Sequence, residues 1–143
     1  MSRRRRGEDG QMTVLIIGFT VIILLMIVVV TDISKVFLVR RDLDSTADGA
    51  VLAAANGLAA VYAQPGAGGN AAIDPDQAAR LTADYLNEVA ASNRFDGLDW
   101  SVDVEGTTVT VRLTSIADLP FQPPGFPGSA DISSESAAIV PIR

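Results

Sequence analysis

A chain of 143 residues has room for one compact unit and an anchor, but not for two full domains. It contains neither cysteine nor histidine, which excludes disulfides, thiolate metal sites and nucleophile–base pairs built on those residues. From Asp42 onward 14 acidic residues stand against 4 basic ones, a net charge of −10. Such a region would repel a phosphate backbone, so we expect no nucleic-acid partner.

An uninterrupted apolar run extends from Met12 to Val30, without a charge, Asn, Gln or Pro. As a helix it would be about 28 Å long, close to the hydrocarbon thickness of a bilayer. Apolar residues cover all of its faces, and a lone strand in lipid would leave its backbone groups unpaired. We therefore predict a transmembrane helix over residues 12–31, with lipid as a partner. The alternatives are the buried helix of a soluble core and a cleaved secretory signal, whose apolar region would be unusually long.

Basic residues flank this run on both sides. The tail of residues 1–11 contains Arg3, Arg4, Arg5 and Arg6. The segment after the run contains Lys35, Arg40 and Arg41. Arginines in a short terminal tail favour keeping that tail in the cytoplasm, so we predict that they set the topology. The predicted location is the cell membrane, with a single span, a cytoplasmic N-terminus and an extracytoplasmic C-terminal domain.

The helical pattern continues beyond the membrane over residues 32–63. Apolar side chains recur at spacings of three and four along one stripe: Val36, Val39, Leu43, Ala47, Ala50, Ala54, Leu58 and Val61. Gly49 and Gly57 would each weaken the helix by about 1 kcal/mol without necessarily ending it, and the expected stop is Gln64-Pro65-Gly66. The stripe is expected to pack on the chain's own domain. The alternative is packing against copies or partners in an assembly.

Residues 64–143 are predicted to form a small α+β domain. Asp74 is a candidate N-cap, with Pro75 at the first helical position and Gln77 placed as in a capping box. An apolar face continues from this cap to about Ala91, which predicts a second, shorter helix.

Two segments that alternate apolar and polar residues, 98–105 and 107–114, predict a β-hairpin. A turn at Glu105-Gly106 would place the apolar residues on one side and Asp99 opposite Arg112. An isolated hairpin is marginally stable in water, so further elements should complete it.

A third strand is predicted from about Ile132 to Val140, and the second helix could cover the apolar face of the sheet. The Pro-rich residues 119–128 should form an extended excursion. We expect this loop to place Phe121 and Phe126 in the core. The alternative is an exposed apolar contact for a partner.

No catalytic, cofactor-binding or metal site is expected. Asp42, Asp44 and Asp48 stand at i, i+2 and i+6 of a helix and do not share a face, which argues against a metal cage. Lys35, the single lysine, follows the membrane span and suits an interfacial anchor. We therefore predict no enzymatic activity and no small-molecule substrate.

A polar and alanine-rich segment follows the apolar run: Asp32, Phe37, Arg40, Arg41, Leu43, Asp44, Ala47, Asp48, Ala50, Leu52, Ala53, Ala54 and Ala55. Together with the run it resembles the N-terminal region of TadE/TadG-like proteins of Flp (tight-adherence) pilus systems, and the remainder is similar to small actinobacterial-type members. The resemblance implies a membrane-anchored, minor pilin-like structural or assembly component of a pilus or secretion apparatus. Its partners would be other pilus-assembly membrane proteins or pilins. It also implies a pilin-like layout, in which the outer half of the long helix packs on an antiparallel sheet.

One feature departs from the prepilin pattern, in which a processed Gly is followed five residues later by Glu. Here the fifth residue after Gly10 is Leu15, which puts cleavage between Gly10 and Gln11 in doubt. An uncleaved chain would remain a permanent component of the inner membrane. The alternative function is a membrane-tethered extracytoplasmic binding module, which would require a concave, partly apolar pocket in the domain.

Overall fold

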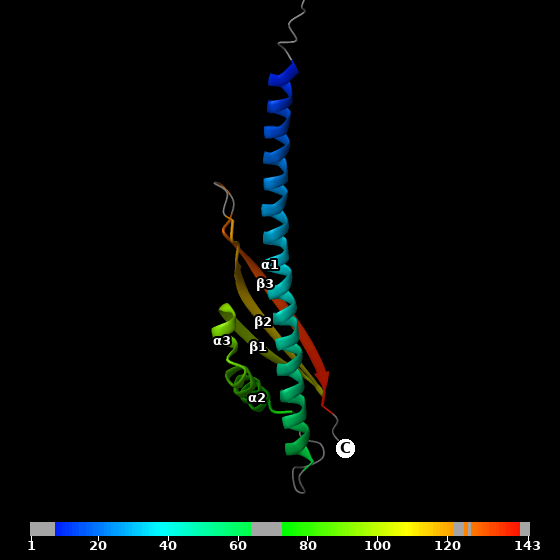
Figure 1. Cartoon of the computed structure of the whole chain (residues 1–143). Coiled ribbons are helices and arrows are strands. Elements are labelled where there is room, and N and C mark those ends of the chain that lie inside the picture. Colours follow the sequence, from blue (N-terminus) through cyan, green and yellow to red (C-terminus); the bar gives the residue numbers. More distant parts are fainter. Residues whose placement is uncertain (1–7, 64–72, 122–124, 126, 141–143) are drawn as a thin grey trace, which may run out of the picture.

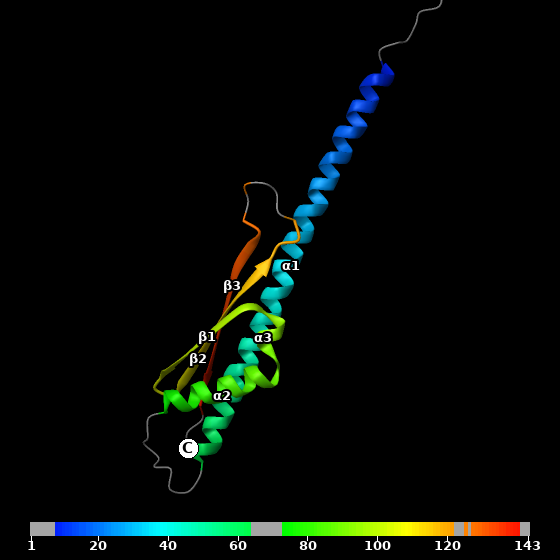
Figure 2. The same ribbon diagram turned by 90° about the vertical axis from the view of Figure 1, so that its left-hand side faces the viewer.

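The computed structural model describes residues 8–63, 73–121, 125 and 127–140. In chain order its elements are α1 (Glu8–Tyr62), α2 (Pro75–Glu88), α3 (Ala91–Arg94), β1 (Asp96–Glu105), β2 (Thr108–Asp118) and β3 (Ser129–Ile139). Figures 1 and 2 show α1 as a long rod, with all other elements gathered along its C-terminal half. The predicted α+β layout of one long helix, one short helix and a small antiparallel sheet is confirmed.

The helix α1 is continuous over 55 residues, although its surroundings change along its length. The apolar side chains of its first half are exposed, whereas one face of its second half is fully buried. That face consists of the small and aliphatic residues of the predicted stripe, each 0% exposed: Leu43, Ala47, Ala50, Ala54 and Leu58. The expectation that the stripe packs on the chain's own domain is therefore confirmed. The expected stop at residues 64–66 lies outside the described residues.

The three strands form one antiparallel sheet in the order β1-β2-β3. The central strand β2 directs Val109, Val111 and Leu113 into the core, where each is fully buried. Helix α1 contacts β2 and β3, while α2 contacts β1 and α1, so both helices cover the same face of the sheet. The opposite face of the sheet is exposed or half-buried and mostly polar, with Ile116 and Ile139 as its exposed large apolar residues.

The hairpin between β1 and β2 turns one residue later than predicted. Glu105 pairs with Thr108, so the turn consists of Gly106 and Thr107. Gly106 has φ +60°, and a glycine with positive φ at the first central position is typical of a type II′ turn, whose twist matches that of the strands. The predicted turn at Glu105-Gly106 is therefore wrong.

This change shifts the pairing by two residues, so the predicted faces are kept while the predicted partners are not. Arg112 lies opposite Ser101 of β1, and the predicted pairing of Arg112 with Asp99 is wrong. On its other side Arg112 lies opposite Glu135 of β3, and the two form an exposed ion pair. Asp99 instead pairs with Thr114.

Helix α2 begins as expected and ends earlier than expected. The Asp74 carboxylate accepts a hydrogen bond from the backbone N–H of Asp76 at 3.0 Å, so Asp74 is the N-cap. The side chain of the cap thus accepts its hydrogen bond from the N–H of Asp76. In a capping box it would accept from the N–H of Gln77. The predicted continuation to Ala91 is wrong, because Ala90 takes the left-handed conformation with φ 50° and separates α2 from the short α3.

The expectation that Phe121 enters the core is also wrong. The connection between β2 and β3 is closed at its base by the backbone N–H of Leu119, which donates to the carbonyl of Gly128 at 2.9 Å. Beyond that base the Phe121 side chain is 45% exposed. Phe126 lies outside the described residues.

The glycines of α1 allow α2 to approach closely. A Cβ atom on Gly49 would lie 2.0 Å from Tyr85 Oη and 2.6 Å from Tyr85 Cζ. A Cβ atom on Gly57 would lie 2.8 Å from Leu81 Cδ1. Tyr85 and Leu81 are one helical turn apart on α2, and each therefore packs directly on the backbone of α1 over a glycine.

Gly49→Ala should consequently destabilise the domain. In an exposed helix this change would stabilise by about 1 kcal/mol. Here the tyrosine ring must move out of the helix interface, and overpacking of this kind costs about 1–3 kcal/mol. The change can be measured as the midpoint of chemical unfolding of the full chain in detergent, followed by the fluorescence of Trp100, the single tryptophan.

Gly18→Ala is the matched control, because a Cβ atom there meets nothing within 4 Å. Combining Gly49→Ala with Tyr85→Ala should remove most of the extra cost of the alanine. A higher unfolding midpoint for Gly49→Ala alone would contradict the proposed role of the glycine.

Candidate interaction surfaces

The first half of α1 presents a bare apolar surface. Val14 is 72% exposed and Leu25 is 61% exposed, and the other large apolar side chains of residues 12–30 are similarly accessible. The helix is long and apolar enough to cross a membrane, and none of its most apolar window is buried within the described chain. Apolar surface of this extent requires lipid or protein around it. The chain is anchored in a membrane by this single helix.

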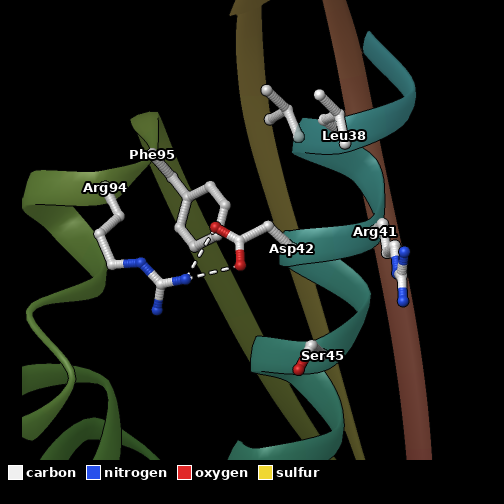
Figure 3. A pocket seen from close by; sticks show the side chains of 7 residues that line it. Leu38, Arg41, Asp42, Ser45, Arg94 and Phe95 are labelled. Carbon is white, nitrogen blue, oxygen red and sulfur yellow. Dashed lines mark hydrogen bonds and ion pairs between the residues drawn. The ribbon is translucent and has the colours of Figure 1, made fainter. Parts of the chain in front are cut away.

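In the second half of α1, an ion pair connects the helix to α3. Figure 3 shows the Arg94 guanidinium facing Asp42, with Nη2 donating to the two carboxylate oxygens at 2.6 and 2.7 Å. The guanidinium carbon also lies 5.4 Å from the ring centroid of the buried Phe95. Both charged side chains are about half exposed, so the pair contributes less than about 1 kcal/mol to folding. Its main effect is to fix the position of α3.

The ion pair lies in an open groove of about 500 Å³ between α1 and α3. Leu38, Val39, Ser45 and Phe95 line the groove beside the pair. The charged groups of Asp42 and Arg94 point toward each other and are satisfied by each other, as Figure 3 shows. A small-molecule site would instead present polar groups that converge on a ligand. The groove is therefore better described as a joint between two elements of the domain.

Two further carboxylates of α1 bind elements of the sheet. The Ser136 hydroxyl of β3 donates to Asp48 Oδ1 at 2.6 Å. The backbone N–H of Phe121, just beyond β2, donates to Asp32 Oδ1 at 3.3 Å. At about 100° per residue, Asp42 and Asp48 stand about 120° apart around the helix, one on each flank of the buried face. Asp42 and Asp48, whose spacing argued against a common metal site, thus connect α1 to opposite sides of the domain.

The predicted family-like segment therefore divides into buried and exposed positions. Leu43 and Ala47 lie in the core, and Asp48 and Asp32 make the contacts given above. Of the other members, Ala50, Ala54 and Ala55 are buried and Ala53 is half-buried. The exposed members on α1 are Phe37, Arg40, Arg41, Asp44 and Leu52. Sequence analysis missed Arg94 as a partner of α1, and the available signal was that few basic residues follow Asp42.

The residues of the predicted topology and processing sites lie at the start of the chain. Arg3, Arg4, Arg5 and Arg6 are outside the described residues. Gly10 and Gln11 are exposed near the beginning of α1, and their processing remains a prediction. Among the residues that the structure describes, no three carboxylates come together as a candidate metal site.

The fold and the bare apolar helix define the class, a single-pass membrane protein whose anchor continues into a small α+β domain. Residues 10–57 match the family of putative Flp pilus-assembly TadE/G-like proteins. This segment is about a third of the chain, and the similarity supports an association with Flp pilus assembly. No curated protein and no solved structure gives a significant match.

Replacing Arg94 by Lys should release α3 locally, because lysine lacks the planar guanidinium that lies over the Phe95 ring while its Nη2 binds Asp42. Hydrogen exchange of the amides in residues 91–95 should become faster, while the global free energy of unfolding changes by less than about 1 kcal/mol. Arg80→Lys is the control, since Arg80 lies 3.9 Å from Asp74 and its side chain is 73% exposed. Equal exchange rates in the two variants would contradict the positioning role of Arg94.

Proposed function

We propose that this chain is a minor pilin-like structural component of a Flp/Tad-type pilus or secretion apparatus, and that it acts through protein–protein contacts. In this proposal residues 1–11 are a cytoplasmic tail and residues 12–31 span the membrane. Residues 32–63 extend the helix, and residues 64–143 form a domain outside the cytoplasm. The arginines of the tail and the negative charge beyond Asp42 support this orientation.

The observation that carries the proposal is that the segment similar to the TadE/G-like family coincides with the long helix α1. Residues 10–57 cover nearly the whole of α1, the element that joins the apolar surface to the domain. The helix continues unbroken from one half to the other, so movement of the apolar half is transmitted directly to the domain. A rigid connection of this kind suits a subunit that packs beside other helical subunits in the membrane while presenting a domain outside.

The distribution of polar groups in the domain favours contacts over chemistry. The Arg94–Asp42, Arg112–Glu135 and Ser136–Asp48 interactions hold elements of the fold together, and each pair satisfies its own charge or hydrogen bond. The exposed sheet face carries carboxylates and hydroxyls from all three strands, which offers a broad polar surface to a partner subunit.

The proposal predicts that deletion of the gene abolishes or alters surface fibres, and that the intact gene restores them. A sharper test replaces residues 12–30 by nineteen leucines, which preserves the anchor and removes the specific helix surface. This variant should reach the membrane in normal amounts and still fail to restore fibres, because the apolar half of α1 contacts partners. Normal fibres and secretion in the deletion strain would refute the proposal, while full rescue by the leucine variant would limit α1 to anchoring.

The proposed topology and the absence of processing are tested together on the membrane-extracted protein. Its intact mass should correspond to all 143 residues, since the Glu expected five residues after a processed Gly is Leu15 here. A protease added to the cytoplasmic side of sealed membranes should leave the domain intact, and the same protease outside should degrade it. A mass that lacks the residues before Gln11 would show that cleavage occurs.

A further inference from the structure

The described chain that directly follows β2 lies beside α1 (Figure 2). The base of the connection between β2 and β3 is closed by the hydrogen bond from Leu119 to Gly128, and beyond this base Phe121 donates its backbone N–H to Asp32 at 3.3 Å. Asp32 stands only two residues after Val30, the last residue of the apolar run. Phe121 is therefore held beside the end of the membrane span.

The height of Phe121 above the hydrocarbon core follows from this contact. From Val30 to Asp32 the helix advances by about 3 Å. The interfacial layer of headgroups is about 5–8 Å thick on each side of the core. The backbone of Phe121 is thus placed within this layer when α1 crosses the bilayer. Because the hydrogen bond is made to the helix itself, the depth of Phe121 is tied to the depth of α1.

Exposed apolar side chains lie on α1 at this height and one helical turn above it. Ile33 and Phe37 lie one turn apart on α1 and are each 64% exposed. Ile33 is about 100° around the helix from Asp32, and Phe37 is on nearly the same side as Ile33. Both side chains therefore lie to one side of the contact between Asp32 and Phe121. Phe121 lies near the height of Ile33, because its backbone N–H binds Asp32. An aromatic ring that is 45% exposed suits the boundary between headgroups and acyl chains better than water.

We propose that Phe121 is a second membrane contact of this protein, and that it inserts into the bilayer interface beside α1. The end of the domain that contains Phe121 then rests on the lipid surface. The partner of this surface is lipid and not another protein. The opposite end of the sheet points outward: Ile139 pairs with Thr108 at the far end of β2, about 30 Å away along the strand. A second contact beside α1 limits how far the helix can tilt in the bilayer, and in which direction.

The inference requires the membrane span and does not depend on a role in pilus assembly. The absence of native cysteine allows single-site labelling of the full chain. Phe121→Cys is labelled with an environment-sensitive fluorophore and placed, at one copy per disc, in nanodiscs of phosphatidylcholine and phosphatidylglycerol. Some discs contain lipids with a nitroxide near the top of the acyl chain. The label at residue 121 should show a blue-shifted emission and severalfold stronger nitroxide quenching than the same label at residue 139.

Three matched positions complete the experiment. Ile33→Cys is the positive control on α1 at the height of Asp32, while Leu52→Cys and Ile139→Cys are exposed positions distant from the proposed membrane surface. The fluorescence of Trp100, measured before labelling, should be the same in all four variants, which establishes that the domain is folded.

Quenching at residue 121 no stronger than at residue 139, with strong quenching at residue 33, would overturn the contact while leaving the anchor intact. Weak quenching at residue 33 would instead contradict the membrane span itself. If the emission of the label at residue 121 were blue-shifted only in discs that contain two copies, the surface would contact a second chain. This outcome would also overturn the proposal. Because the proposed contact is apolar, quenching of the label at residue 121 should persist at high salt.

Discussion

The burial of one face of α1 beneath the sheet is the constraint on which the rest of the structure depends. A three-stranded sheet with a single covered face has little stability until another element covers it. The inward residues Val109, Val111 and Leu113 of β2 are fully buried because α1 covers this strand, while α2 covers β1 beside it. The alanines of α1 let the helix approach the strands, and Gly49 and Gly57 let α2 approach α1. The domain therefore cannot be separated from its helix without losing its core.

This dependence connects the membrane to the domain. The same helix that is bare over residues 12–30 supplies the core residues Leu43 and Leu58, with no described break between them. A force or a packing preference acting in the membrane therefore reaches the domain through one rigid element. The TadE/G-like segment, residues 10–57, comprises both parts of this arrangement. The proposed function adds to this arrangement the side-by-side packing of such helices.

Three carboxylates of α1 determine how the domain is oriented around the helix. Asp42 and Asp48 fasten α3 and β3 on opposite flanks of the buried face, and Asp32 binds the connection after β2. Each bond is exposed or half-exposed and contributes little to stability. Their combined effect is directional: they define which edge of the domain lies toward the apolar half of α1. The proposed lipid contact of Phe121 follows from the last of them.

The sequence by itself determined the features that depend on local periodicity. The apolar run, the continuous stripe from Val36 to Val61, the cap at Asp74 and the alternation in the strands each follow from neighbours in the chain. The tertiary structure decided the rest, because it depends on groups distant in sequence. The hairpin register depends on the positive φ of Gly106, and the end of α2 depends on the left-handed conformation of Ala90. The ion pair joins Arg94 to Asp42, 52 positions earlier. The position of Phe121 beside α1 could not be predicted locally, since it depends on a hydrogen bond to a helix residue 89 positions earlier.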